Sequence, residues 1–318
     1  MVATDVRAKR PDIQIIKHNG LTWVNIEHPT RAEMTYLRQE FGFHPLALDD
    51  CLSRVQLPKV DEYDDYIFLV LHFPLFNKVM RLTQPSQVCV FASASFIVTV
   101  HHGELKPLTK LFQDCSQNEE TRKDLMSRSS GYLLYRVIDV LIDYCFPILN
   151  KVLENVERME SEFFSKQLGH VVQDFSTIRR DIIAYRRIIR PQISVMETLE
   201  AKEYPFLKVD PDVYFGDLAD HTRRIWEGLE EQKEVADGLS DALLTMNIIL
   251  SNEAVRYLTV IFTIFLPMTI LSSLYGMNVP LPWGANPGGN VFTLPMVIII
   301  SVLMSGGMLY WFYRKGWL

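Results

Sequence analysis

The sequence predicts an α+β cytoplasmic domain, then a long stalk helix, then two membrane-spanning helices at the C-terminus. Three observations predict this fold class. Short apolar runs separated by turn residues fill the first 125 residues, a helical period replaces them from Gly131 onward, and no Asp, Glu, Lys or Arg occurs between Arg256 and Arg314. Mean hydropathy over the 318 residues is near zero, as expected when a large soluble part is averaged with a small membrane part.

The charge-free stretch has the length of two bilayer crossings. A hydrocarbon core of ~30 Å requires about 20 apolar residues per helix. We therefore expect a first span at residues 257–277, a second at 292–313, and a short tail at 314–318. Residues 278–291 hold three Pro, three Gly and three Asn, which predicts a non-helical loop outside the hydrocarbon.

Residues 1–125 are expected to form the α+β domain. Strands are predicted at 13–16 and 22–26, joined as a hairpin around Asn19-Gly20, and at 66–71, 87–91 and 96–100, with helices at 30–41 and 44–51. The acids between Asp61 and Asp65 lack the spacing of a calcium loop, so a solvated turn is favoured there over a cation site.

Residues 126–210 change to a helical period and predict an antiparallel helical hairpin with its turn at Leu168-Gly169-His170. In residues 211–256 an apolar repeat spaced four and three apart predicts the cytoplasmic part of the stalk, interrupted only at Gln232. Its members are Ile225, Leu229, Ala236, Leu239, Leu243, Met246 and Leu250. Such a seam indicates a coiled assembly, and because no breaker follows it, one helix is expected from near Asp217 to Gly276.

The same alternation continues into the first span and places polar residues on one face of it. The series runs Asn252, Val255, Thr259, Phe262, Leu266, Thr269, Ser273 and Gly276. Polar groups facing lipid cost free energy, so this face should meet neighbouring helices or water. The alternative is that the hydroxyls bond carbonyls of their own helix and simply pack. Pro267 cannot donate to the Thr263 carbonyl, which predicts a mild kink.

Tyr275-Gly276-Met277-Asn278 ends the first span, and Ser251-Asn252-Glu253 and Phe265-Leu266-Pro267 precede it. With the second span at the extreme C-terminus and the ending Lys315 to Leu318, this arrangement resembles the CorA family of divalent-metal channels. The resemblance implies a homopentameric helical funnel; the apolar seam alone does not define the number of subunits. It also implies a selectivity filter at Tyr275, Gly276, Met277 and Asn278, and a pore lined by Asn252, Val255, Leu258, Phe262, Leu266 and Thr269, to which the alternation described above adds Ser273.

The chemistry of Mg²⁺ fits such a filter. Mg²⁺ loses water reluctantly, so a site that hydrogen-bonds its hydration shell captures it best. A ring of Asn278 amide oxygens and Gly276 carbonyls would offer neutral acceptors, and Val255, Leu258 and Leu266 would form an apolar gate that closes by dewetting. The expected function is passive Mg²⁺ uptake, with Co²⁺ and Ni²⁺ as further cargo. The alternatives are a transporter of Zn²⁺ or another transition metal, and a membrane-anchored metal sensor or scaffold without transport.

The resemblance also implies a regulatory Mg²⁺ site at the base of the stalk. Asp217 matches the family's aspartate there, with Asp220 and His221 beside it. The position of the partner acid reads Asn77 and Lys78, which should weaken such a site. A helix cap or first-turn acid is therefore the favoured role for Asp217.

Other classes are disfavoured by what the sequence lacks. No phosphate-binding loop, nucleophile elbow or metal-hydrolase motif is present, so we expect no enzyme, no organic cofactor and no nucleic-acid partner. The N-terminus has no apolar signal segment, and Arg314 and Lys315 follow the last span, so both termini are expected in the cytoplasm of a cell-membrane protein. The four widely spaced cysteines are expected to be reduced thiols.

Overall fold

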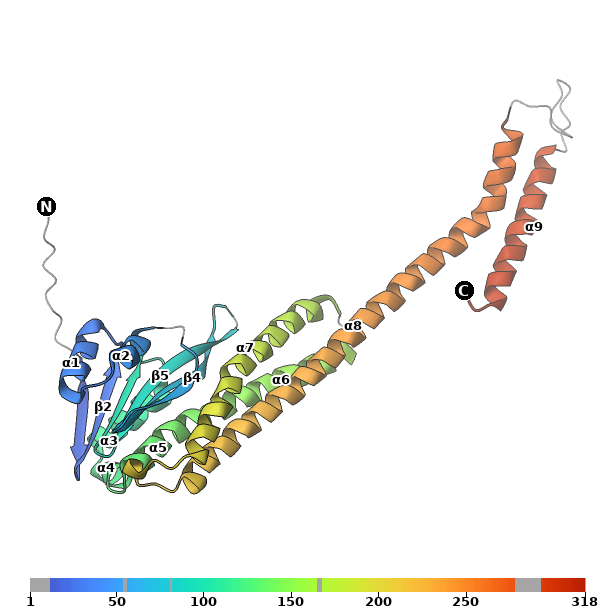
Figure 1. Ribbon diagram of the computed structural model, residues 1–318. Helices are drawn as coiled ribbons and strands as arrows, with labels where there is room; N and C mark the ends of the chain where they lie inside the picture. The colour runs from blue at the N-terminus through green and yellow to red at the C-terminus, as the bar shows by residue number, and fades with distance from the viewer. Residues whose placement is uncertain (1–11, 54–55, 81, 165–167, 278–292, 318) are drawn as a thin grey trace, which may run out of the picture. The chain divides into compact units, whose positions relative to one another are not determined.

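The computed structural model describes residues 12–53, 56–80, 82–164, 168–277 and 293–317 (Figure 1). For 163–164, 168–174, 275 and 293–294 it describes the backbone alone. The chain forms two compact units, Met1–Asp237 and Gly238–Leu318.

The first unit contains a six-stranded sheet of order β1-β2-β6-β5-β4-β3. Its strands are β1 (Gln14–His18), β2 (Leu21–Glu27), β3 (Lys59–Glu62), β4 (Tyr66–Asn77), β5 (Leu82–Ser93) and β6 (Phe96–His101). Only the β2–β6 pair is parallel among the described strand pairs. Asn19 and Gly20, with φ of 49° and 82°, form the two-residue turn that joins β1 to β2 and confirm the predicted hairpin.

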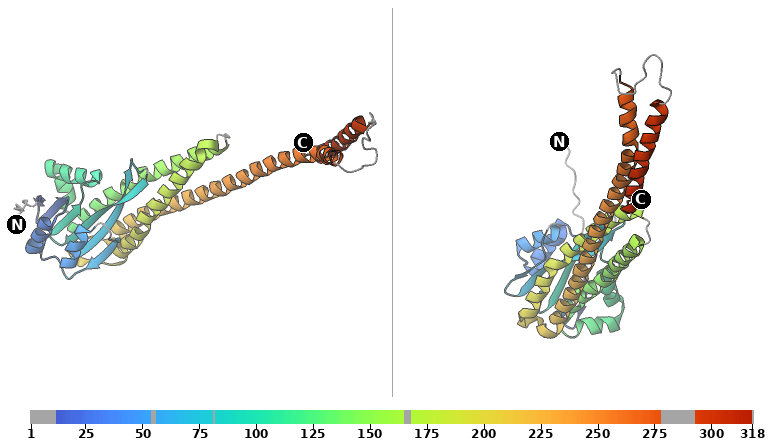
Figure 2. Two further views of the ribbon diagram at one scale, coloured as in Figure 1. Left: turned by 90° about the horizontal axis from the view of Figure 1, so that it is seen from above. Right: turned by 90° about the vertical axis from the view of Figure 1, so that its right-hand side faces the viewer.

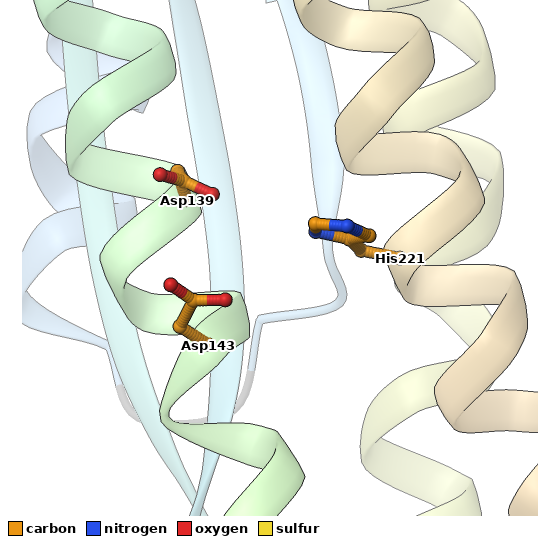
Figure 3. Close-up of side chains that lie close together, drawn as sticks. All are labelled: Asp139, Asp143 and His221. Carbon is orange, nitrogen blue, oxygen red and sulfur yellow. The ribbon is translucent and has the colours of Figure 1, made fainter.

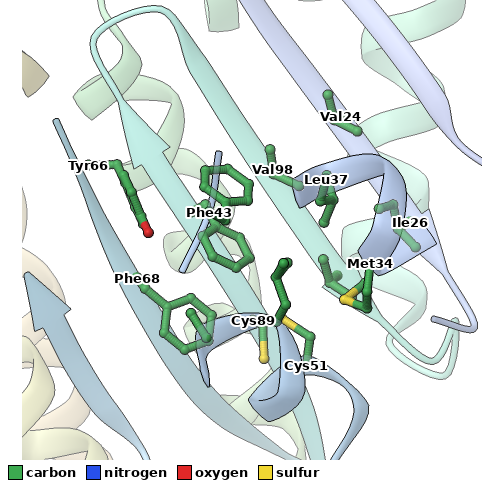
Figure 4. Packing of buried hydrophobic residues seen from close by; sticks show 14 of the residues in the cluster. Val24, Ile26, Met34, Leu37, Phe43, Cys51, Tyr66, Phe68, Cys89 and Val98 are labelled. Atoms are coloured by element: carbon green, nitrogen blue, oxygen red, sulfur yellow. The ribbon is translucent and has the colours of Figure 1, made fainter. Parts of the chain in front are cut away.

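Helices α1 (Arg31–Phe41) and α2 (Pro45–Leu52) cover one face of the sheet (Figure 4). Thr30 caps α1 through a capping box with Glu33, and Pro45 occupies the first turn of α2, where its missing N–H is not needed. Phe43 stacks on Phe91 of β5 with ring centroids 4.0 Å apart. Alternate residues of β2, β4, β5 and β6 point into this cluster, as the two-residue period of a strand requires.

The opposite face packs against α3 (Lys106–Gln117), α5 (Ser130–Asp143) and α7 (Leu168–Ala201). Trp23 is fully buried there: its indole N–H donates to Thr99 Oγ1 at 3.2 Å, and its ring meets Phe112 edge-on. Because both faces are covered, β4 and residues 88–92 of β5 are almost continuously apolar in sequence. Two helices, α3 and α4 (Glu119–Met126), were not anticipated from the sequence.

The structure corrects two local expectations in this unit. Asp61 and Glu62 lie in the edge strand β3, where Lys59 bonds Asp61 and Asp50 while Lys202 and Tyr204 bond Glu62. Asp64 and Asp65 are exposed in the turn between β3 and β4, as predicted. Leu168 to His170, predicted as the hairpin turn, lie in the first turn of α7.

The predicted helical region contains α5, α6 (Cys145–Phe164), α7 and the short η1 (Pro205–Leu207). The helix expected from near Asp217 is α8, which begins earlier, at Pro211, and ends at Tyr275. The early start has a simple cause: proline is compatible with a first helical turn, and Asp210 Oδ1 accepts from the Asp212 N–H at 3.1 Å.

In the second unit the end of α8 lies beside α9 (Thr293–Arg314), as the views in Figures 1 and 2 agree. Two helices of the described chain are long and apolar enough to cross a membrane, and their apolar windows fall in α8 and α9. Val260 and Pro267 of α8 and Phe312 of α9 are buried here, whereas most of both helices is exposed in the single chain.

All four cysteines are free and buried: Cys51, Cys89, Cys115 and Cys145. Burial raises the pKa of Cys115 to about 11 and that of Cys145 to about 12. These side chains therefore serve as small apolar core residues.

Candidate functional site

The residues predicted to line a pore share one exposed face of α8. Asn252, Val255, Leu258, Phe262, Leu266, Thr269 and Ser273 are all exposed in the single chain. At about 100° per residue, their mean direction lies about 140° from that of Val260 and Pro267, the buried residues of the same segment. The predicted pore face is thus nearly opposite the packed face, and nothing within the described chain covers it.

This exposed face is apolar over most of its length. Val255, Leu258 and Leu266, the predicted gate, are each more than half exposed, as is Phe262 between them. Neither α8 from Tyr257 onward nor α9 before Arg314 carries an Asp, Glu, Lys or Arg. A helix face of this kind would bind a hydrated cation only through hydroxyl, amide or carbonyl oxygens, and would exclude water wherever aliphatic side chains converge.

The threonines of this segment bond to their own helix. Thr259 Oγ1 donates to the Val255 carbonyl at 2.8 Å, Thr263 Oγ1 to the Thr259 carbonyl at 2.7 Å, and Thr269 Oγ1 to the Phe265 carbonyl at 3.0 Å. This is the arrangement given above as the alternative to a water-facing role. The Thr269 hydroxyl can still accept hydrogen bonds from water through the lone pairs of its oxygen.

The predicted filter begins where α8 ends. Tyr275 is the last helical residue, the Gly276 N–H donates to the Ser272 carbonyl at 3.0 Å, and the Met277 N–H donates to the Leu274 carbonyl at 3.3 Å. A Cβ at position 276 would lie 3.2 Å from the Ser272 carbonyl oxygen, so a larger residue would require the helix end to shift by a few tenths of an ångström. Asn278, the principal filter residue, lies outside the described residues.

A second group of polar side chains lies in the first unit, between α5 and α8. Asp139 and Asp143 project from one face of α5, and the His221 ring of α8 faces them (Figure 3). One ligand atom from each residue can be chosen so that all three lie within 4.8 Å of one another. Two carboxylates and an imidazole at this separation can hold a divalent cation, and the imidazole favours transition metals over Mg²⁺.

The electrostatics of this cation cluster (Asp139, Asp143 and His221) match that role. Asp139 is buried, and burial together with the neighbouring Asp143 raises the pKa of its carboxyl, although Arg136 bonds it at 2.7 Å. The His221 Nδ1 atom is buried and has no hydrogen-bond partner among the described residues. A bound cation would relieve the repulsion between the carboxylates and give this nitrogen a partner.

Of the two predicted regulatory residues, only Asp217 lies next to the cation cluster. Its Oδ1 atom is 3.7 Å from His221 Nε2, and its Oδ2 accepts from the Tyr135 hydroxyl at 3.1 Å. Asp220 is exposed and bonds Arg223 at 2.7 Å, so the structure does not bring it into the group. Asn77, where the partner acid was expected, caps the β4–β5 turn by accepting from the Val79 and Met80 N–H groups.

Asp139 and Asp143 were missed by the sequence analysis. Their i, i+4 spacing was the available signal, because it places both carboxylates on one helix face. The position of His221 opposite them is tertiary information.

Comparison with known proteins gives a consistent answer. A family model described as "CorA-like Mg2+ transporter protein" matches residues 18–314. The cobalt/magnesium transport protein CorA of Thermotoga maritima is 28% identical over 305 residues, which cover 93% of this chain and 83% of that protein. The zinc transport protein ZntB of Pectobacterium atrosepticum is 22% identical over 300 residues, which cover 93% of this chain and 88% of that protein. The solved structure of the CorA magnesium transporter from Methanocaldococcus jannaschii has a TM-score of 0.78 at 22% identity, covers 95% of this chain and 93% of that one, and shares its fold.

Proposed function

Because this chain belongs to the family of CorA-like Mg²⁺ transporters, a family of membrane transporters of divalent metals and not of enzymes, we propose that it is a passive channel for Mg²⁺ uptake. The observation that carries the proposal is the uncovered face of α8. It holds the predicted pore residues in one row, opposite the face that packs against α9.

An exposed apolar and hydroxyl-bearing face on an uncharged helix needs partners in a membrane. Copies of the same chain arranged around an axis supply them, and a pentamer is the assembly implied by the resemblance described above. The axis would then be lined by rings of Asn252, Thr269 and Ser273, with Val255, Leu258 and Leu266 as the apolar gate. Both termini would lie in the cytoplasm, with Arg314 and Lys315 at the inner interface.

Passive transport follows from the absence of ionisable groups. The sequence between Arg256 and Arg314 has no Asp, Glu, Lys, Arg or His that could relay protons, and no phosphate-binding loop that could couple ATP hydrolysis. The membrane potential alone favours entry of a dication by about 4.6 kcal/mol per 100 mV. The ring of Asn278 amides and Gly276 carbonyls would bind the incoming hydrated Mg²⁺ ion, because its neutral oxygens match the hydration shell without trapping the ion.

We assign the cation cluster of Asp139, Asp143 and His221 a regulatory role, with Asp217 beside it. The cluster connects α5 to α8, the helix that carries the predicted pore face, so occupancy by a cation would stabilise one arrangement of these two helices. Its imidazole predicts tighter binding of Co²⁺, Ni²⁺ or Zn²⁺ than of Mg²⁺.

The second candidate function is transport of Zn²⁺ or another transition metal, and the similarity to ZntB is the observation that favours it. The sequence argues for Mg²⁺ instead, because neither His nor Cys occurs between Arg256 and Arg314 to bind a softer ion.

One experiment separates these functions. The purified protein is reconstituted in liposomes that hold an ion-sensitive dye, an inside-negative potential is imposed, and uptake of Mg²⁺, Co²⁺ and Zn²⁺ is compared. Mg²⁺ entry that disappears with Asn278→Ala supports the neutral-ring channel. Entry of Zn²⁺ without Mg²⁺ would favour the transition-metal branch. Absence of flux of any ion would leave a membrane-anchored sensor or scaffold.

A further inference from the structure

Ser305 of α9 makes an unusual hydrogen bond to α8. Its hydroxyl donates to the Ile264 carbonyl at 2.6 Å, across 41 residues of sequence, and both residues are half-buried. Serines in apolar helices more often donate to a carbonyl one turn back in their own helix. Ser301 of α9 does so, donating to the Val297 carbonyl at 2.8 Å. The chain therefore contains both arrangements one helical turn apart.

The acceptor lies where α8 has lost part of its own bonding. Pro267 has no N–H, so the Thr263 carbonyl has no intrahelical donor from position 267, and the proline ring pushes that carbonyl aside. Ile264 is the next residue in the same distorted turn. Figure 1 shows that α8 bends in the part that runs beside α9. In a hydrocarbon environment a weakened or missing backbone bond is costly. The Ser305 hydroxyl does not replace the donor that the Thr263 carbonyl lacks, but it ties the adjacent carbonyl of the same turn to α9 and so stabilises the bent form.

The bond lies on the packed side of α8. Pro267 and Val260 are buried, while Thr263 and Ile264 are half-buried. The predicted pore residues are on the opposite side, and Leu266, Thr269 and Ser273 lie at or beyond the kink, toward Gly276. A change in the bend would displace these residues from the axis of an oligomer, whereas Val255 and Leu258 lie before the kink.

We propose that Ser305 is a positioning residue of the ion pathway. Its hydroxyl donates a hydrogen bond to the turn distorted by Pro267, and this bond fixes the bend of α8. The bend in turn positions Leu266, Thr269 and Ser273, the part of the predicted pore face nearest the filter. The role rests on the proposed function, since only a pore makes the bend matter for ion flux. The hydrogen bond from Ser305 to Ile264 does not depend on the proposed function, and it can be measured separately.

The bond is tested by the carbonyl chemical shift of Ile264. The full-length protein in lipid bilayers is labelled with ¹³C at Ile carbonyls and ¹⁵N in Phe, so that a solid-state correlation spectrum detects only Ile-Phe peptide bonds. The sequence has three of these, Ile67-Phe68, Ile261-Phe262 and Ile264-Phe265. In Ser305→Ala the Ile264 signal should move upfield, as a carbonyl that loses a donor does, while the other two stay in place. Ser301→Ala should move none of them.

The positioning role is tested by Mg²⁺ uptake in liposomes. Ser305→Ala should lower the maximal rate about threefold, the effect of one interhelical hydrogen bond in a membrane, and leave the half-saturating Mg²⁺ concentration unchanged. Ser305→Thr keeps a hydroxyl and should restore the rate, and Ser301→Ala should match the wild type. In a Pro267→Ala background the amide at 267 again donates to Thr263 and the cause of the kink is removed, so Ser305→Ala should no longer alter the rate.

An Ile264 signal that does not respond to Ser305→Ala overturns the proposal, because the bond is then absent from the protein in a bilayer. A shifted signal with unchanged uptake overturns the positioning role. Equal losses of rate in Ser301→Ala and Ser305→Ala would also overturn it, since α9 would then respond to any lost hydroxyl. If the wild type conducts no ion, the proposed function and the positioning role fail together, while the carbonyl shift still decides the bond.

Discussion

The side chain of Gln192 in α7 hydrogen-bonds both backbone groups of His72 in β4. Its Oε1 atom accepts from the His72 N–H at 3.3 Å, and its Nε2 atom donates to the His72 carbonyl. His72 lies just beyond the residues of β4 that pair with β3, where no strand in the described part of the chain lies on this side of β4. The buried amide of Gln192 therefore takes the place of a strand at the open edge of the sheet.

We expect Gln192→Leu to lower the free energy of unfolding of the protein by about 2 kcal/mol. Two hydrogen bonds worth about 1 kcal/mol each are lost, and both backbone groups of the half-buried His72 lose a partner. Hydrogen exchange of the full-length protein, followed on peptides from β4, should show faster exchange at His72. Ser194→Ala, an exposed position on the same helix, is the control. Unchanged exchange at His72 would mean that the edge is protected by packing alone.

A buried histidine should make the first unit sensitive to acid. Burial, with smaller contributions from His102 and His28, lowers the pKa of His101 to about 4. Its Nδ1 atom accepts from the Gly103 N–H and its Nε2 atom faces Asn25 Oδ1, both at 3.0 Å, so protonation would break the first of these bonds. The pKa of a histidine in the unfolded chain is about 6.5. The free energy that the neutral His101 imidazole contributes to folding is therefore fully present above pH 6.5 and is lost as the pH falls toward 4.

Between pH 7 and pH 5 the wild type should accordingly lose about 2 kcal/mol of stability through this group. His101→Gln should remove that part of the pH dependence in thermal unfolding of the full-length protein, whatever its effect at pH 7. His18→Gln, at a more exposed histidine that bonds Ser127, should leave the slope as it is. Parallel slopes for the wild type and His101→Gln would contradict the assignment.

The cation cluster predicts opposite effects of one substitution with and without metal. Because burial and Asp143 raise the pKa of Asp139 in the folded protein, its stabilising effect is greatest at low pH and is lost as the pH rises through that pKa. At pH 7 without divalent cations, Asp139→Asn should therefore raise the thermal midpoint. With Co²⁺ or Mg²⁺ the wild type should gain stability, as any ligand of the folded state provides, and the variant should gain much less.

Asp220→Asn is the matched control for this cluster, because Asp220 lies on the same helix as His221 but bonds Arg223. Its thermal midpoint should rise with Co²⁺ by as much as that of the wild type. A cation-dependent gain of equal size in Asp139→Asn would place the regulatory site elsewhere.

The proposed apolar gate predicts a gain of flux. Leu258→Ala shortens a side chain of the predicted pore face, so the constriction should hydrate more readily and Mg²⁺ uptake in liposomes should become faster. Ile261 is also exposed and apolar but lies about 110° around α8 from the mean direction of the predicted pore residues, so Ile261→Ala should leave the rate unchanged. Equal effects of the two substitutions would remove Leu258 from the gate.

Much of the fold could be predicted from local pattern. The Asn19-Gly20 hairpin, the buried strands and the apolar end of α8 all follow from periods of two or 3.6 residues and from turn chemistry. Helix α3 was predictable in principle, since Leu108, Phe112 and Cys115 follow a helical spacing and Pro107 stands in its first turn. The edge strand β3 was harder to predict, because closely spaced acids are typical of a turn. Only the tertiary fold shows that basic side chains pair with them.

The pairings that give each site its chemistry could not be predicted in the same way. Gln192 meets His72 across 120 residues and Ser305 meets Ile264 across 41. His221 faces Asp139 and Asp143 only because α5 packs beside α8. Sequence spacing identifies which residues share a helix face, but the contact between faces depends on tertiary packing, which no local period encodes.

The burial of all four native cysteines makes the natural chain a convenient starting point for site-directed labelling. Maleimide reagents attack exposed thiolates, and Cys51, Cys89, Cys115 and Cys145 are enclosed by the core, with raised thiol pKa values for Cys51, Cys115 and Cys145. A single cysteine introduced at Leu258 or Ile261 would then be the main reactive thiol of the folded protein. Its modification rate from water would report which side of α8 faces an aqueous path, without first removing any native residue.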